Sequence, residues 1–200
     1  PQTSAIAVLP DAQFLNGITS LDSGTDLIAD TAKGVVWSLN IRTGEIAISL
    51  EDETTKLEAV AGLVIGVNSI RILGDDLYYK NTPKLPFCRV RIDPGRATGP
   101  YEVITRGIVA DDFAIAKDNS TYLASIYANE ITQVLPDWTC EVIAGSPNYS
   151  SVAGPTSAAF GRRKCDNSTL YITTGGAGSM PINGAYIVGR KAAALISRRS

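Results

Sequence analysis

Four small polar residues occupy equivalent places in a repeated pattern and could do chemistry together. They are Asn16, Asn68, Asp111 and Thr156, and each lies at the start of an alternating apolar run. Amide, carboxylate and hydroxyl groups can hydrogen-bond a substrate, and their oxygens suit Ca²⁺ or Mg²⁺. The chain contains no histidine, so Ser-His-Asp and Cys-His catalysis cannot be assembled from it. Chemistry here would use amides, carboxylates, hydroxyls, lysine or simple confinement.

The segment 66–79, GVNSIRILGDDLYY, shows the repeated pattern most clearly. Asn68 begins it, alternating apolar residues follow, and the run turns at Gly74 and returns through residues 77–79. This pattern is typical of two short antiparallel strands joined by a tight turn. Each of the four polar residues therefore lies where an innermost strand is expected to begin.

The repeat predicts an all-β fold, because its length of about 40 to 50 residues with four short strands per unit is that of a propeller blade. Further strands are expected at 17–21, 26–29, 35–41, 46–50, 88–92, 101–104, 130–135, 140–144 and within 186–196. Turns are expected at Thr43-Gly44 and at Asp93-Pro94-Gly95. We predict that residues 1–200 belong to a single β-propeller domain.

The two ends of this repeat do not match. Residues 4–9 predict a lone strand, which would be the outer strand of a preceding blade, and the last unit lacks an outer strand. Open sheet edges are normally covered or closed, so we predict that roughly 100 upstream residues, about two blades, complete the ring. This missing N-terminal propeller segment is either cleaved off or present as a separate chain. Residues 51–61 are expected to hold a short helix or a loop.

Composition excludes several classes of function. The chain is 44% hydrophobic and 19% charged, which is enough apolar sequence to bury a core. Its net charge of −2 argues against a nucleic-acid partner. No apolar run reaches the length of a membrane-spanning helix, so no membrane association is expected.

Cysteines and glycosylation signals bear on location. Cys88, Cys140 and Cys165 show no metal-ligand spacing, and they allow either one disulfide with a third thiol paired elsewhere or three reduced thiols. N-glycosylation sequons lie at Asn119, Asn148 and Asn167. They favour a protein that is secreted or in the secretory pathway.

Several motifs carry a resemblance to a known family. The inner-strand starts at Asn16, Asn68 and Asp111 resemble those of the six-bladed propellers of the senescence-marker protein, gluconolactonase and strictosidine-synthase group. The motifs FLNGIT, DTAKGVVW, LPFCRVRID, AGPTSAAFGR and LYITTGG are similar to a fungal branch of that group. The resemblance spans the chain and implies that it supplies blades three to six.

For lactonase members of this group, the resemblance implies a divalent cation on the propeller axis. Asn68 and Asp111 match two of its ligands, Asn16 matches a nearby asparagine, and a glutamate ligand would lie in the absent blades. Such a cation could polarise a lactone carbonyl and lower the pKa of a bound water. Ser69 and Asp112 depart from the family, which has glycine after each ligand. The alternative is that the polar residues only hydrogen-bond neighbouring blades.

Fungal relatives of this kind include hetero-Diels-Alder catalysts, which need no covalent or metal step. The resemblance therefore implies a cofactor-independent cyclase of fungal secondary metabolism, with Asn16, Asn68 and Asp111 orienting a small-molecule substrate in the central channel. A metal-dependent lactonase and a non-catalytic ligand-binding propeller are the alternatives. Four aromatic residues, Tyr78, Tyr79, Tyr127 and Trp37, would either add aromatic surface to the pocket or, as we favour, pack between blades. Further residues are expected to line the pocket. The lining residues are Asp30, Asn81, Asp112, Ser125, Thr156 and Thr174.

Overall fold

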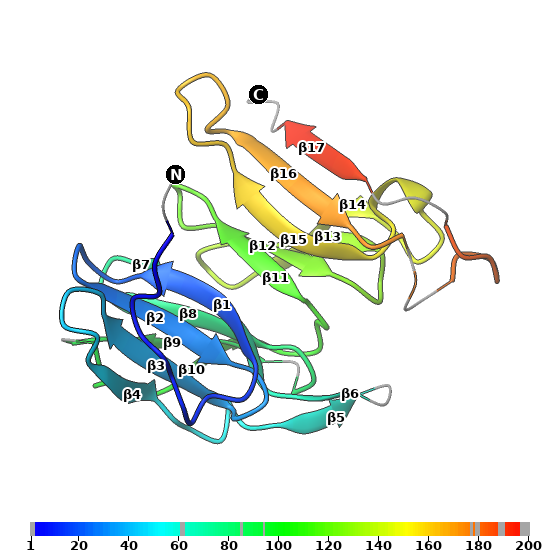
Figure 1. Ribbon diagram of the computed structural model, residues 1–200. Coiled ribbons are helices and arrows are strands. Elements are labelled where there is room, and N and C mark those ends of the chain that lie inside the picture. Colours follow the sequence, from blue (N-terminus) through cyan, green and yellow to red (C-terminus); the bar gives the residue numbers. More distant parts are fainter. Residues whose placement is uncertain are drawn as a thin grey trace. The chain divides into compact units, whose positions relative to one another are not determined.

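The computed structural model describes residues 3–60, 63–84, 86–93, 95–176, 178, 181–187 and 191–196. Within these ranges the chain forms seventeen strands and one 3₁₀ turn, Ser150–Val152, and no α-helix. The chain divides into two compact units, Pro1–Arg106 and Gly107–Ser200. Each unit contains two larger sheets whose strands follow one another in the chain (Figure 1). None of the described helical structure is long and apolar enough to cross a membrane.

The first sheet of the first unit is an antiparallel meander of four strands. Its last turn forms as expected, because Gly44 adopts a φ of 75° and the Asn40 side-chain oxygen accepts hydrogen bonds from the backbone N–H groups of Arg42 and Thr43. The strands are β1 (Leu15–Ser20), β2 (Thr25–Asp30), β3 (Val35–Asn40) and β4 (Ile46–Leu50).

The second sheet repeats this meander, and Gly74 provides its first turn with a φ of 60°. The two sheets enclose a core that includes Leu27, Val36, Ile70 and Tyr79, all fully buried. The inner strands β1 and β7 lie side by side. The strands of the second sheet are β7 (Val67–Leu73), β8 (Asp76–Asn81), β9 (Phe87–Arg91) and β10 (Glu102–Thr105).

The connection between these sheets begins with a loop at residues 51–57, as expected, but differs from the expectation beyond it. It forms a two-stranded ribbon, β5 (Glu58–Val60) paired with β6 (Leu63–Ile65). The base of the connection is held by nonlocal hydrogen bonds: the buried Thr55 hydroxyl donates to the Gly34 carbonyl at 2.7 Å, and the Gly66 N–H donates to the Thr31 carbonyl at 2.8 Å. Partners that distant in the chain leave no local sequence signal.

The predicted strand at residues 4–9 is wrong, because this segment joins no ladder. Instead, Ala7 and Leu9 pack over a cluster around Trp37 on the first sheet. The segment is anchored where it enters β1: the Asp30 carboxylate accepts hydrogen bonds from the backbone N–H groups of Gln13 and Phe14 at 2.9 and 3.0 Å. An alternating apolar run is thus satisfied by side-chain packing without a partner strand.

The second unit also contains two sheets, one of four strands and one of three described strands. The strand expected within 186–196 is confirmed only for residues 192–196, and residues 188–190 lie outside the described part. A shared core between the sheets includes Ala124, Ile131, Ala158 and Leu170. The strands are β11 (Asp112–Ile115), β12 (Thr121–Ser125), β13 (Glu130–Val134), β14 (Cys140–Gly145), β15 (Pro155–Phe160), β16 (Thr169–Thr174) and β17 (Ala192–Ile196).

These sheets are propeller blades, each with an inner strand that begins near one of the four polar residues. Asn16 lies in β1, Asn68 in β7 and Thr156 in β15, while Asp111 immediately precedes β11. The all-β class, the repeat and the turn at Thr43-Gly44 are therefore confirmed. The Asp93-Pro94-Gly95 turn includes Pro94, which lies outside the described residues.

Candidate functional site

In the first unit, the starts of β1 and β7 bring Asn16 and Asn68 together. Asn16 Nδ2 donates a hydrogen bond to Asn68 Oδ1, and Asn68 Nδ2 donates to Thr82 Oγ1 at 3.4 Å. Asn68 is buried, whereas Asn16 is exposed. The close approach depends on Gly17, because a Cβ at that position would lie 2.5 Å from the Asn68 carbonyl oxygen. The buried amide thus holds the exposed one in a defined place.

This amide pair can bind an oxygen or a hydroxyl group. The second N–H and the amide oxygen of Asn16 have no partner among the described residues. An amide offers two donors and one acceptor oxygen. Asn16 can therefore hydrogen-bond a ligand while Asn68 fixes its orientation. The pair also links two blades, as the alternative interpretation of these residues predicted.

In the second unit, Asp112 links the inner strands in a similar way. Its Oδ2 accepts hydrogen bonds from Ser157 Oγ at 2.6 Å and from the Ala158 N–H at 3.3 Å. Asp111 is half-buried and its N–H donates to the Ala124 carbonyl at 3.0 Å. The departure from glycine at position 112 therefore has a structural reason, because this carboxylate joins β11 to β15.

The remaining inner-strand residue, Thr156, lies against the neighbouring strand β16. Its hydroxyl is 3.2 Å from the Thr173 hydroxyl. Asn16 and Asn68 belong to the first unit, and Asp111 and Thr156 belong to the second. The structure brings Asn16 and Asn68 into contact, whereas the hydrogen bonds between β11 and β15 are made by Asp112 with Ser157 and Ala158.

Four of the predicted lining residues end the second strand of a blade, and three of these four hold loops in place. Asp30 is fully buried, and besides the two N–H groups before β1 it accepts Trp37 Nε1 at 3.2 Å. Asn81 Nδ2 donates to the carbonyl oxygens of Thr54 and Lys56 at 2.9 and 2.8 Å. The Thr174 hydroxyl accepts the Lys191 N–H at 3.1 Å.

The fourth, Ser125, lines a cavity of about 430 Å³ in the second unit. Its hydroxyl lies 3.3 Å from the Thr132 hydroxyl, and Tyr127 contributes to the same wall. A cavity of this size, with a few hydroxyls among apolar groups, resembles small-molecule sites in general. It is lined by Gly107, Ile108, Val109, Ser125, Tyr127, Ala128, Glu130, Thr132, Cys140, Glu141 and Val142.

Among the aromatic candidates, Trp37 and Tyr79 are buried, as packing between blades requires. The Tyr79 hydroxyl lies 2.7 Å from Thr54 Oγ1, and burial raises its pKa far above the ordinary value. Tyr78 packs against Phe87 with ring centroids 5.9 Å apart. Packing between blades is therefore confirmed for Tyr79, whose core includes strands of both sheets. Trp37 instead packs within the first sheet and against the segment before it, and Tyr78 contacts a residue of its own sheet.

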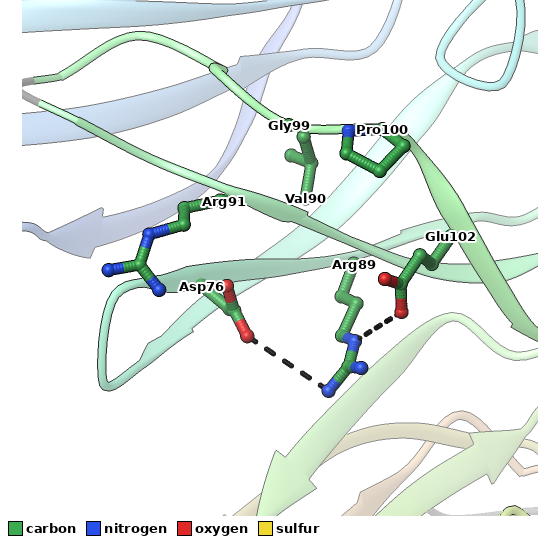
Figure 2. Close-up of a pocket in the computed structure, with 7 residues that line it drawn as sticks. All are labelled: Asp76, Arg89, Val90, Arg91, Gly99, Pro100 and Glu102. Carbon is green, nitrogen blue, oxygen red and sulfur yellow. Dashed lines mark hydrogen bonds and ion pairs between the residues drawn. The ribbon is translucent and has the colours of Figure 1, made fainter.

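A smaller cavity of about 260 Å³ lies beside β9 and β10, and Figure 2 shows Arg89 between two carboxylates in its wall. Arg89 Nε donates to Glu102 Oε2 at 2.8 Å, and the other side of the same guanidinium lies 4.0 Å from Asp76 Oδ2. Two carboxylates thus compensate the Arg89 charge, which indicates a structural ion-pair network.

One unusual residue, Lys80, has no counterpart among the predicted site residues. It is fully buried in β8, and its Nζ donates to the Asn81 carbonyl at 2.8 Å. Burial lowers the pKa of Lys80 to about 7, and Cys88 opposes this shift. The sequence signal is a lysine that directly follows Leu77, Tyr78 and Tyr79 in the strand.

The cysteines and acids do not form a metal cluster in the described part of the chain. Cys88 is buried, Cys140 and Cys165 are exposed, and all three are free thiols. No group of three or more Cys, Asp or Glu side chains that could hold a metal occurs among the described residues. Of the sequon asparagines, Asn119 and Asn148 are exposed and Asn167 is half-buried.

Two fungal proteins are similar in sequence to this chain, and no family model matches it. Both carry the name "Putative hetero-Diels-Alderase". The Phoma protein is 28% identical over 196 residues, which cover 86% of this chain and 56% of that protein. The Sarocladium schorii protein is 29% identical over 208 residues, which cover 86% of this chain and 51% of that protein. The chain therefore spans about half the length of these relatives.

Solved structures share the fold. A streptogramin B lyase superposes with a TM-score of 0.61 at 14% identity over 94% of this chain and 56% of its own. A gluconolactonase from Xanthomonas campestris superposes with a TM-score of 0.59 at 16% identity, over 90% of this chain and 62% of its own. The expected resemblance to fungal hetero-Diels-Alderases with a gluconolactonase-like propeller fold is thus confirmed.

Proposed function

We propose that this chain is part of a fungal enzyme that catalyses a hetero-Diels-Alder cyclisation. The observation that carries the proposal is the sequence similarity, over most of the chain, to two fungal proteins of that name. The Asn16–Asn68 pair supports it with a suitable binding group.

To catalyse this reaction, a protein needs to position the two reactants and to donate a hydrogen bond to one of them. In a hetero-Diels-Alder reaction, a heterodiene and an alkene form one C–C and one C–O bond by moving three electron pairs, and no proton or leaving group is transferred. A fixed donor to the heterodiene oxygen draws electron density from the diene, and confinement holds both partners in reactive contact. We assign the donor role to the second N–H of Asn16, oriented by Asn68, and expect Asp111 to help position the substrate.

The test is product chirality, because the uncatalysed reaction gives a racemate. An ortho-hydroxymethylphenol, which loses water to give a quinone methide, is incubated with a vinyl ether and the folded protein. We expect one enantiomer of the dihydropyran in excess. Asn16→Ala and Asn68→Ala should abolish the excess, whereas Asn148→Ala, at an exposed loop position, should keep it. A racemate from folded wild-type protein would contradict the proposal.

A metal-dependent lactonase is the second candidate, supported by the gluconolactonase fold and by the amide and carboxylate at positions 68 and 111. The donor set in the first unit does not fit a calcium ion by itself. Asn68 Oδ1 already accepts from Asn16, and Ca²⁺ takes about six to eight oxygen ligands. Chelator-sensitive hydrolysis of glucono-δ-lactone would favour this candidate, and saturable ligand binding without turnover would favour a non-catalytic propeller.

We also propose that the protein passes through the secretory pathway, on the basis of its three sequons. Asn119 and Asn148 are exposed and open to glycan transfer. A protein purified from its source should lose mass on treatment with an N-glycan amidase, and an unchanged mass would contradict this proposal.

A further inference from the structure

A second cavity in the second unit lies at the ends of β11 and β12 that are opposite to Asp111 and Ser125. It has a volume of about 330 Å³ and opens between the sheet β11–β14 and the sheet β15–β17. Asp118 lines it from the turn after β11, and Ser168 lines it from the residue before β16. Asp111 and Ser125, by contrast, lie at the opposite ends of β11 and β12. The cavity is lined by Asp118, Tyr122, Gln133, Ile143, Phe160, Ser168, Leu170 and Leu195.

The polar groups of this cavity favour a cation. Asp118 Oδ1 accepts the Ser120 N–H at 3.0 Å, which fixes the carboxylate, and Gln133 Nε2 donates to the Tyr122 hydroxyl at 3.0 Å. Burial raises the pKa of Tyr122, and the negative charge of Asp118 raises it further. Among the described residues that line the cavity, Asp118 is the one charged group, so this part of the wall presents a carboxylate and no basic side chain.

The apolar groups form a compact surface beside that carboxylate. Tyr122 and Phe160 pack edge to face, with centroids 5.3 Å apart and planes at 80°. Leu170 is buried beneath them and belongs to the core between the two sheets. Aromatic faces attract ammonium groups, and a carboxylate next to them strengthens the preference for a cation.

We propose that this cavity binds a small primary amine with an aromatic or branched apolar body. The ammonium group lies at Asp118, and the apolar body packs on Phe160, Leu170 and Leu195. The volume falls near the lower end of the range of about 300 to 1,000 Å³ for small-molecule sites, which limits the ligand to a single ring with a short side chain. The site is independent of the cyclisation chemistry proposed above.

Calorimetric titration of the whole chain with phenethylamine tests this site. We expect saturable binding of one equivalent, and no binding of phenylacetate, which has the same ring and the opposite charge. Asp118→Asn should weaken phenethylamine at least about tenfold, and it keeps the side-chain oxygen that accepts the Ser120 N–H. Glu45→Gln removes an exposed carboxylate of the first unit, outside the cavity, and should leave the affinity unchanged.

A second variant places a positive charge in the cavity wall. Ile143 is 38% exposed, so Ile143→Arg should be tolerated by the fold and should abolish phenethylamine binding. Equal binding of phenethylamine and phenylacetate, an unchanged affinity in Asp118→Asn, or no binding to the folded wild type would each overturn the proposal. None of these results bears on the product chirality assay.

Discussion

At the scale of single residues, the ionisable groups with the largest consequences are those that the fold has buried. Asp30 and Lys80 are both fully buried, yet they differ in their partners. Asp30 accepts four N–H donors, whereas Lys80 donates to one carbonyl oxygen. The first is therefore expected to stabilise the fold, and the second to cost stability.

Asp30→Asn should destabilise the first unit. Burial acts to raise the pKa of Asp30, but the N–H donors of Phe14 and Gln13, with Trp37 and Lys33, outweigh burial and hold the pKa below its ordinary value. An amide cannot accept all four donors, so we expect a loss of about 2 to 4 kcal/mol in the free energy of unfolding. Urea denaturation followed by Trp37 fluorescence measures it.

The same group predicts a pH dependence. Because the folded pKa is lowered, the contribution of Asp30 is present above its unfolded pKa and is lost as the pH falls through the folded value. The difference in stability between wild type and Asp30→Asn should therefore shrink in acid. A difference that stays constant down to the acid transition would contradict this account.

Lys80→Met should stabilise the protein at neutral pH. The folded pKa near 7 lies below the ordinary value of 10.5, so the folded state binds fewer protons between these values and stability rises with pH across that window. Below about pH 7 the buried Lys80 amine is charged, and the full cost of burying that charge is present. Its removal should therefore raise the free energy of unfolding by about 1 to 3 kcal/mol. Stability of the two proteins is measured from pH 7 to 8.5, below the ordinary pKa values of Cys88 and Tyr79.

Between pH 7 and 8.5, the free energy of unfolding should rise with pH in the wild type and not in Lys80→Met. Lys80→Arg is the matched control, since a guanidinium stays charged and should destabilise the fold at every pH. If Lys80→Met is less stable than wild type at pH 7, then the amine contributes through its hydrogen bond to the Asn81 carbonyl and the burial argument fails.

At the scale of elements, the approach of β1 to β7 positions the amide pair. Gly17→Ala would place a Cβ 2.5 Å from the Asn68 carbonyl oxygen, a backbone atom that cannot move aside cheaply. We expect a loss of about 1 to 3 kcal/mol from forced separation of the strands. The Asn16–Asn68 hydrogen bond should weaken with it, which amide side-chain NMR shifts would report.

Gly175→Ala provides the comparison for that prediction. Its added Cβ meets neighbours at 3.4 and 3.5 Å, an ordinary contact distance. Its effect should be within about 0.5 kcal/mol of wild type. If both variants lose the same stability, the tight packing of β1 on β7 is not what Gly17 provides.

The elements that could be predicted from the sequence are those that depend on local signals. The turns at Gly44 and Gly74 have glycine where the backbone needs a positive φ, and alternation located the strands around them. The segment 4–9 was mispredicted as a strand because the cluster around Trp37 that it packs against is distant in sequence. The ribbon β5–β6 pairs residues that are close in sequence, and it was missed because strands of three residues are too short to show alternation. Alternation reports that a segment buries one face, and it does not say whether a strand or a side-chain cluster covers that face.

The site was predictable to a similar extent. The repeat placed Asn16 and Asn68 at equivalent strand starts, which is why their contact could be expected. The anchoring roles of Asp30 and Asn81 could not, because their partners are backbone groups of other loops. The amine cavity at Asp118 joins residues from six strands and two turns, and no single motif carries it.

At the scale of the whole molecule, an exposed apolar surface on the first unit calls for a partner. Phe14, Leu15 and Ile18, at the start of the first blade, are 41% to 58% exposed, and Ile6 and Val8 in the preceding segment are more exposed still. Exposed apolar side chains along β1 indicate an interaction surface. We propose that further propeller blades, on this chain's own longer form or on a separate chain, cover it.

The chain of 200 residues alone should therefore self-associate through this surface. Sedimentation velocity at rising protein concentration should show a growing oligomer fraction, and Phe14→Ser with Ile18→Ser should reduce it, because both side chains are exposed and their loss opens no cavity. Tyr186→Ser removes an aromatic ring that is 68% exposed in the second unit and should leave association unchanged. A wild type that stays monomeric at every concentration would show that the surface needs no cover. Oligomers that persist in the double variant would place the association elsewhere on the molecule.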